Sequence, residues 1–113
     1  MTYEISVTMG RNVAGEPMPE GHWLMLGTQT EDTLAKALGH GPTEYWRGKG
    51  DWDDKREENL RLVWRVSVAP SVPSLMVTLA ALAHEYGQDS IALAVGESYL
   101  VEADKTDIRE ITP

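Results

Sequence analysis

The chain has 113 residues and a formal net charge of −8, from 18 acidic and 10 basic residues, and it contains no cysteine. This length suits one domain with a single two-layer core, and the acidic balance argues against a protein that binds nucleic-acid polymers through their phosphates. The missing thiols exclude disulfides, thiol catalysis and cysteine metal sites.

A strand over residues 3–9 opens the predicted fold, because apolar residues alternate there with polar ones. Residues 10–18 contain two glycines and a proline, which indicates a loop that leaves this strand. Pro19 can then occupy the first turn of a helix, where its missing N–H costs nothing. The chain is therefore expected to begin with a strand, a loop and the start of a helix.

The first helical segment, residues 19–38, leaves two interpretations open. Its apolar residues fit one helical stripe, which favours a single helix. Thr28 and Glu31, however, have the spacing of a capping box, which favours two short helices with a break near Gly27. Pro42 prevents either version from continuing.

The middle of the chain predicts a β-hairpin. A strand over residues 43–48 is followed by a turn over residues 50–56, which is rich in Asp and Lys. The next strand covers residues 57–68 and is expected to be central, because its apolar residues alternate from Leu60 to Val68.

A second helix follows this hairpin. Ser71 is suited to cap its N-terminus, and Pro73 lies just inside it. Apolar residues then recur at spacings of three and four over residues 75–86. Gly87 stands where a left-handed cap would end the helix.

Two short strands, residues 90–95 and 99–103, are predicted after this helix, joined by a tight turn at residues 96–97. Residues 1–103 would form one α+β domain, and residues 104–113 would form a polar tail. The element order β-α-β-β-α-β-β is that of a split βαβ unit with an added strand. We therefore expect a ferredoxin-like antiparallel sheet with two helices on one face.

Aromatic and cationic residues gather in the middle hairpin and in the first loop. Aromatic rings can stack on a planar group, while Arg and Lys bind phosphate or carboxylate through charge-assisted hydrogen bonds. The predicted ligand-binding residues are Arg11, Asn12, Tyr45, Trp46, Arg47, Lys49 and Trp52. If the loop and the hairpin tip lie at opposite ends of the sheet, another subunit must complete the pocket. In the alternative interpretation Trp46 and Trp52 pack under the hairpin and Arg47 pairs with acidic residues.

Other chemistry has weaker support in the sequence. His22, His40 and His84 are far apart and lack the spacing of metal ligands, so we expect no metal site and no cofactor. We also assign no catalytic residues, because no nucleophile or phosphate-loop motif occurs. An acid/base pair is the alternative, and its candidates are Asp51, Asp53, Asp54, Glu57 and Glu58.

Arg61 and Arg65 alternate on the polar face of the third strand. Exposed charges there discourage edge pairing or line an interface, and we expect the interface, in keeping with a homo-oligomer. The alternative is that both arginines bind an anion across the sheet.

The chain contains several short motifs, namely GRN after a strand, PM with a Trp a few residues on, the glycine-flanked Gly50-Asp51-Trp52, a glutamate-led strand and GQDSIALAV. In these motifs it resembles a poorly characterised family of small domains of unknown function from bacterial and phage genomes. The resemblance implies a ferredoxin-like fold and a phage or mobile-element origin, and it implies no established activity. This sequence departs from the family at residues 27–30, where such domains carry an unbroken helix.

The leading functional hypothesis is a non-enzymatic binding protein that sequesters a small anionic, nucleotide-like signal, in the manner of phage anti-defence proteins. One alternative is an interaction module that inhibits a host protein. Another is a small enzyme that uses Asp51, Asp53 or Glu57 with a histidine. The sequence lacks a signal-peptide pattern and an apolar run of about 20 residues, so we expect no membrane association and a cytoplasmic location, in the host if the protein is phage-encoded.

Overall fold

The computed structural model describes residues 2–52 and 55–98, and it shows an α+β arrangement. Its elements are β1 (Thr2–Gly10), β2 (Asn12–Val13), β3 (Glu16–Pro17), α1 (Glu20–Leu38), β4 (Glu44–Trp52), β5 (Lys55–Val66), α2 (Val72–Glu85) and β6 (Ala92–Ser98). The predicted order of helices and strands is confirmed up to β6, with the small β2–β3 hairpin inside the expected loop.

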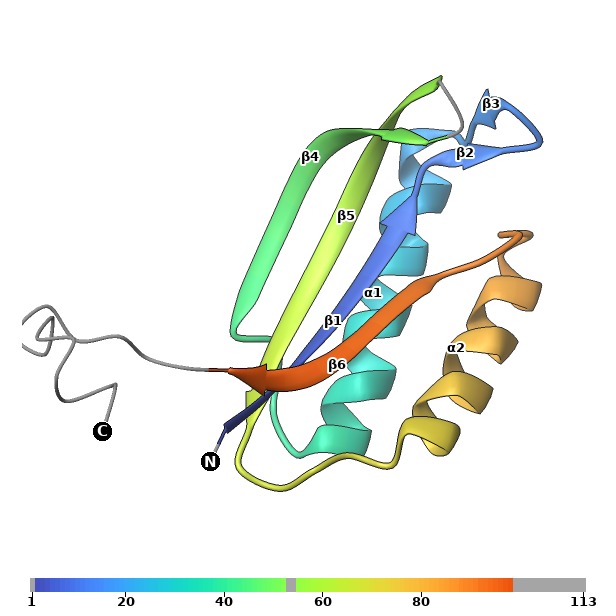
Figure 1. Cartoon of the computed structure of the whole chain (residues 1–113). Helices are drawn as coiled ribbons and strands as arrows, with labels where there is room; N and C mark the ends of the chain where they lie inside the picture. Colours follow the sequence, from blue (N-terminus) through green and yellow to red (C-terminus); the bar gives the residue numbers. More distant parts are fainter. Residues whose placement is uncertain (1, 53–54, 99–113) are drawn as a thin grey trace, which may run out of the picture.

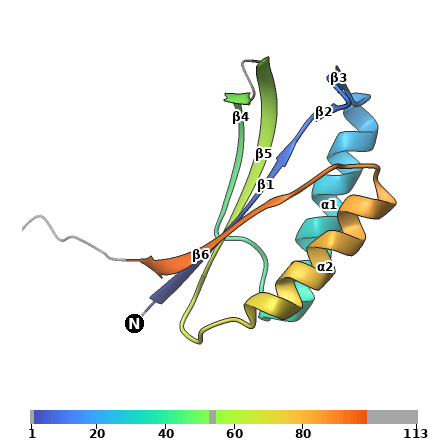
Figure 2. The same cartoon turned by 45° about the vertical axis from the view of Figure 1, so that its right-hand side comes forward.

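Four strands form one antiparallel sheet in the order β4, β5, β1, β6. Helices α1 and α2 lie side by side on one face of this sheet (Figures 1 and 2). Within the described part of the chain no helix covers the other face, which we call the open face. The expectation of two helices on a single face is therefore confirmed.

The core lies between the sheet and the helices. Alternate residues of β1 and β5 face it, because Ile5 pairs with Trp64 and Met9 pairs with Leu60 across the two central strands. The fully buried side chains of the core include Ile5, Val7, Met9, Trp23, Leu26, Leu34, Leu60, Leu62 and Trp64. The period-2 pattern of the sequence thus identified the buried face of both central strands.

Helix α1 is continuous through Gly27, so the version with two short helices is wrong. The Thr28 hydroxyl donates a 3.0 Å hydrogen bond to the carbonyl of Leu24, one turn earlier, and so does not cap a second helix. A β-carbon built at Gly27 would lie 3.0 Å from Leu60 Cδ1. Gly27 therefore lets α1 approach β5 closely and does not mark a break.

The central hairpin is confirmed, but its strands are longer than predicted. β4 and β5 still pair at Asp51 with Arg56 and at Trp52 with Lys55. The predicted turn over residues 50–56 is therefore too long, because cross-strand pairing continues through a polar stretch that local sequence assigns to a turn.

Helix α2 has the ends that the sequence predicts. The Ser71 hydroxyl accepts the N–H of Ser74 at 3.4 Å, and a proline occupies the first turn. Gly87 has a φ of 71°, in the left-handed region. Of the described helices, neither combines the length and apolar character that crossing a membrane requires.

The predicted turn at residues 96–97 is wrong. β6 runs straight through both residues, since Glu4 pairs with Gly96 and Tyr3 pairs with Glu97. Pairing with β1 keeps this segment extended although its composition suits a turn. The predicted strand over residues 99–103 and the tail lie outside the described residues.

Candidate functional site

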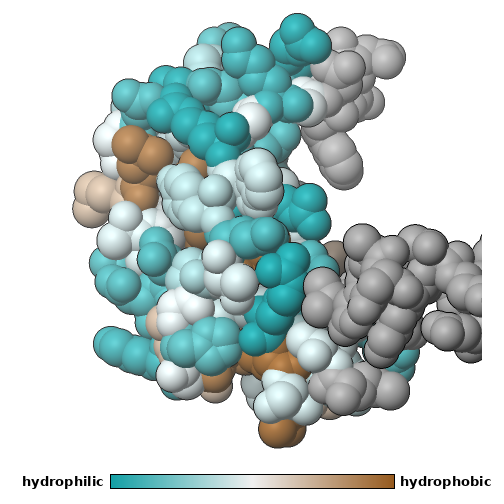
Figure 3. All heavy atoms as spheres, turned by 90° about the vertical axis from the view of Figure 1, so that its left-hand side faces the viewer, coloured by the Kyte–Doolittle hydropathy of each residue, from teal (hydrophilic) through white to brown (hydrophobic). Residues whose placement is uncertain are grey.

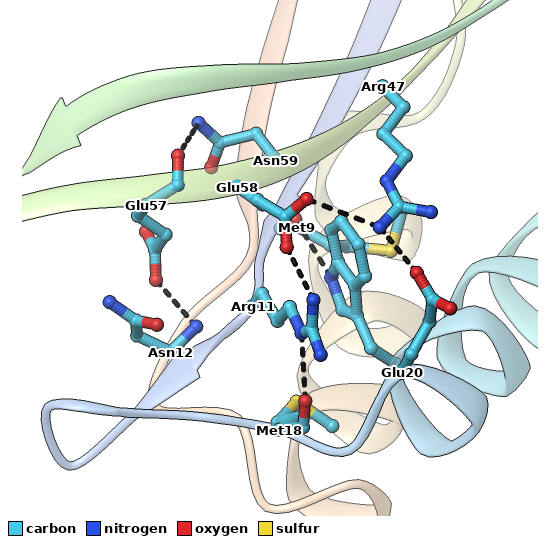
Figure 4. Close-up of polar contacts among 10 residues, drawn as sticks. Met9, Arg11, Asn12, Met18, Glu20, Arg47, Glu57, Glu58 and Asn59 are labelled. Atoms are coloured by element: carbon cyan, nitrogen blue, oxygen red, sulfur yellow. Dashed lines mark hydrogen bonds and ion pairs between the residues drawn. The ribbon is translucent and has the colours of Figure 1, made fainter.

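Two of the predicted ligand residues, Arg11 and Arg47, meet on the helix-covered side of the sheet. Arg11 follows β1 and Arg47 lies on β4, so the first loop and the hairpin reach the same end of the molecule (Figure 4). Glu58 Oε2 lies 2.5 Å from Arg11 Nη1, and its Oε1 lies 3.2 Å from Arg47 Nη2. Arg47 Nη2 is also 2.5 Å from Glu20 Oε1, at the start of α1. Both guanidiniums therefore have carboxylate partners.

The buried indole of Trp23 supports this ion-pair cluster. The guanidinium carbons of Arg11 and Arg47 lie 5.6 and 5.1 Å from the centre of its ring, within cation–π range. Hydrogen bonds from Arg11 and then Arg47 hold the pKa of Glu58 below its ordinary value. Hydrogen bonds to Glu20 and Glu58 raise the pKa of Arg47. The cluster joins β4, β5, α1 and the first loop.

The other aromatic and basic residues of the prediction are spread over both faces of β4. Tyr45 and Lys49 share the face of Arg47, and both are exposed. Trp46 lies on the open face beside Arg61 and is 57 % exposed, so it does not pack under the hairpin. The side chain of Trp52 lies outside the described part of the structure.

A cavity of about 350 Å³ opens at one end of the open face. It lies between the β2–β3 hairpin, the start of β5 and the loop from α2 to β6. The lining residues are Thr8, Gly10, Asn12, Ala14, Gly15, Glu57, Asn59, Gln88, Asp89, Ser90 and Ala92. Of the predicted ligand residues whose side chains the structure describes, only Asn12 lines it.

The carboxylate of Glu57 is fixed at this cavity by the chain that follows β1. Glu57 Oε2 accepts the backbone N–H of Asn12 at 2.7 Å (Figure 4). The β2–β3 turn folds back because Ala14 and Gly15 have φ values of 51° and 83°, as in a tight two-residue hairpin. Gly10 leaves room for Glu57, because a β-carbon at that position would collide with the carboxylate.

Gln88 and Asn59 form further walls of the cavity. Gln88 is 9 % exposed, and its Nε2 donates to the carbonyl of Gly10 at 2.7 Å and to Met18 Sδ at 3.0 Å. This contact holds the loop with Asp89 against the end of β1. Asn59 is half-buried on the open face between Gly10 of β1 and Gly48 of β4, and its Nδ2 donates to the carbonyl of Glu57 at 3.4 Å.

The cavity is polar and negatively charged. Among the described residues, two carboxylates, three amide side chains and two hydroxyl groups line it, and no basic side chain does. No histidine lines it either, and the described residues contain no group of three or more His, Cys, Asp or Glu placed to hold a metal ion. Its ionised carboxylates accept hydrogen bonds, while its amide and hydroxyl groups can both accept and donate them.

Sequence reasoning missed most of this cavity. The sequence indicates Glu57 only as an acid/base candidate, and it does not distinguish Thr8, Asn59 or Gln88 from other polar residues. One signal was present, because Asn59 is a residue with low strand propensity at the start of an alternating strand. Gln88 carried no such signal, since its role depends on contact with Gly10, 78 residues away in the chain.

Comparison with known protein families found no matching family model, and comparison with curated proteins found no matching sequence. These two comparisons therefore assign no function to the fold or to the cavity.

Proposed function

We propose that this chain is a non-enzymatic binding protein that holds a small, nucleotide-like ligand in the cavity at the end of the open face. The observation that carries the proposal is the Glu57 carboxylate, which Asn12 holds at a cavity lined with amide groups. A fixed carboxylate is an acceptor with a defined direction, and such groups give small-molecule sites their specificity. The volume lies near the lower end of the range of about 300–1,000 Å³ found for ligand pockets.

The carboxylate of Glu57 favours a ligand that brings hydrogen-bond donors to it. A carboxylate receives two parallel N–H groups well, as its bidentate pairs with arginine illustrate. The N1–H and 2-amino edge of guanine offers the same planar donor pair as a guanidinium. We therefore assign the base of the nucleotide to the cavity, with its donor edge toward Glu57 and Asn59.

The anionic part of such a ligand would remain outside, over the sheet. Arg61 is the cation beside the cavity on this face, because it pairs directly with Thr8 of the cavity wall. Arg61 Nε donates to the Ser6 hydroxyl at 2.9 Å and Arg61 Nη2 lies 3.9 Å from Glu4 Oε1, while the Arg61 side chain is still 51 % exposed. A phosphate would compete with Glu4 for this exposed guanidinium. Arg61 would thus take the role that the sequence suggested for Arg11 and Arg47.

Binding alone would be enough to sequester a nucleotide signal, the activity expected of a phage anti-defence protein. The strand order β4-β5-β1-β6 and the alternation of helices and strands support a ferredoxin-like fold. The phage or mobile-element origin remains part of the proposal and rests on the resemblance described above.

The enzyme alternative receives less support from the geometry. It needs a histidine beside a carboxylate, but His22 lies against Tyr86, with ring centres 5.2 Å apart. His40 contacts the carbonyl of Gly41, and His84 is an exposed residue of α2. The Glu57 carboxylate instead accepts a backbone N–H, which positions it for recognition.

Calorimetric titration with nucleotides tests this function. Guanosine monophosphate and cyclic guanine nucleotides are expected to bind more tightly than inosine monophosphate, which lacks the second N–H donor. Glu57→Gln should weaken binding by about 10- to 100-fold, the effect of losing a charge-assisted hydrogen bond. Glu85→Gln, on the exposed side of α2, is the control and should bind like wild type. Absence of heat with every nucleotide would overturn the proposal.

A further inference from the structure

β4 is an edge strand of the sheet. On one side it pairs with β5 over all nine of its residues, and no described strand lies on its other side. Edge strands expose a row of N–H and C=O groups that can pair with another chain, and proteins usually shorten or block them. At nine residues β4 is long for such an edge, since strands commonly have about five or six residues.

The direction of the free backbone groups follows from the pairing with β5. The carbonyl of Val63 accepts the N–H of Thr43. The N–H and C=O groups of the odd-numbered residues of β5 therefore point toward β4. Antiparallel pairing alternates, and the even-numbered residues of β4 accordingly face β5. The N–H and C=O groups of Tyr45, Arg47 and Lys49 therefore point away from the sheet.

Two large rings flank this free edge. Tyr45 is 51 % exposed on the helix-covered side, and Trp46 is 57 % exposed on the open face. The surface seen from the β4 side is otherwise mostly hydrophilic, with hydrophobic residues in small separate patches (Figure 3). A strand added to β4 would cover part of both rings, and aromatic residues of this kind are enriched at protein interfaces.

The charges along β4 select the register if the added strand is a second copy. A two-fold axis relates the two antiparallel strands, and it must lie between one residue and the same residue of the other copy. Only then do opposite residues point to the same face of the sheet. An axis at Arg47 would place the two Arg47 side chains opposite each other. An axis at Gly48 would place Arg47 of one copy opposite Lys49 of the other. Like charges directly opposite are unfavourable. These two registers are therefore disfavoured.

An axis at Trp46 avoids this repulsion. It places the two Trp46 rings opposite each other and Tyr45 opposite Arg47, with five residues of β4 paired on each copy. Registers centred closer to either end of β4 are less favourable. They place the two Lys49 side chains opposite each other, pair fewer strand residues, or leave the rings of Tyr45 and Trp46 uncovered. We propose that two copies of this chain associate through β4, antiparallel and centred on Trp46, into one sheet made of two four-stranded halves.

The ion pairs of Arg47 hold the edge strand β4 in place before a second copy binds. The contacts of Arg47 with Glu20 and Glu58 hold the centre of β4 against α1 and β5. The strand is thus ordered before a partner arrives, which lowers the entropy cost of association. The interface lies beside the proposed ligand cavity without using any of its lining residues, so it goes beyond the proposed function.

Cysteine crosslinking tests the register directly, because the chain has no cysteine of its own. Trp46 would be a pair without hydrogen bonds across the axis, where Cα atoms lie about 4.5 Å apart, within disulfide range. Trp46→Cys is expected to form a covalent dimer on mild oxidation. Val77→Cys, at a 72 % exposed site on α2, is the matched control and should form much less. Equal crosslinking of the two variants would overturn the proposal.

Sedimentation supplies the second measurement. The wild-type chain should sediment with twice its monomer mass of 12.5 kDa, while Trp46→Lys, which opposes two lysines, should sediment as a monomer with an unchanged circular dichroism spectrum. A monomeric wild type, or a dimer that Trp46→Lys does not affect, would exclude this interface. Nucleotide binding by a monomeric wild type would leave the cavity intact as a site while refuting the dimer.

Discussion

The carboxylate of Glu57 lies over the backbone of Gly10, in the space that a β-carbon at residue 10 would occupy. Glu57 in turn accepts the N–H of Asn12. The missing side chain at one position of β1 therefore determines where the central acceptor of the cavity lies. Side chains do not usually cross a neighbouring strand so closely, and only glycine permits it here.

Gly10→Ala should alter the cavity while leaving the stability of the fold nearly unchanged. The new methyl group displaces the flexible end of Glu57, so the free energy of unfolding should change by no more than about 1 kcal/mol. The amide of Asn12 should lose its protection from hydrogen exchange, and the affinity for the nucleotide should fall by about 10-fold or more. Gly96→Ala, where the methyl group meets open space, is the control. Unchanged Asn12 protection in Gly10→Ala would contradict this account.

The pH dependence of stability should reveal the cluster around Glu58. Its pKa is lower in the folded chain than its ordinary value of about 4.3, so its contribution is complete above that value. The contribution is lost as the pH falls through the lower folded value, because protonation breaks the pairs with Arg11 and Arg47. Glu58→Gln should therefore unfold more easily than wild type near neutral pH, and the two melting temperatures should converge in acid. Parallel curves at every pH would refute this assignment.

Thr30 offers a stabilising substitution in α1. Its hydroxyl oxygen is fully buried and has no hydrogen-bond partner. Thr30→Val keeps the shape and removes the unpaired polar atom, so the free energy of unfolding should rise by about 1 kcal/mol. Thr28→Val is the matched control, because the exposed Thr28 hydroxyl is bonded to Leu24 and its loss should not stabilise the chain. Chemical denaturation measures both, and a less stable Thr30→Val would show that this hydroxyl has a partner.

The stability of the fold should depend strongly on Trp23. It is fully buried, and its Nε1 donates to the carbonyl of Met9 at 3.4 Å. Trp23→Ala should lower the free energy of unfolding by about 3–5 kcal/mol through cavity formation and loss of the arginine contacts. Met76→Ala, at an exposed site on α2, should change it by less than about 0.5 kcal/mol. Similar effects of the two substitutions in denaturant titrations would contradict this role.

The elements that the sequence predicted correctly depend on local patterns. Alternation identified the buried faces of β1 and β5, and the cap at Ser71 identified the start of α2. The failures arose where tertiary contact outweighs local preference. Gly27 is a packing contact with Leu60, and Gly96 stays extended because it pairs with Glu4.

The site was harder to predict because sequence shows charges but not their partners. Arg11 pairs with Glu58, a residue 47 positions away, and Arg47 pairs with Glu20, 27 positions away. Composition therefore suggested two cations ready for a ligand, while the fold gives each a carboxylate. The cavity residues Gln88 and Thr8 become neighbours only when the loop after α2 reaches the end of β1.

The link from Arg47 to Glu20 also limits how copies of this chain can exchange segments. A foreign strand can be added outside β4, but it cannot replace β4 until the ion pairs with Glu20 and Glu58 break. The outermost strand is thus tethered to the helix layer, which should hinder domain swapping of the hairpin when the protein is concentrated or refolded.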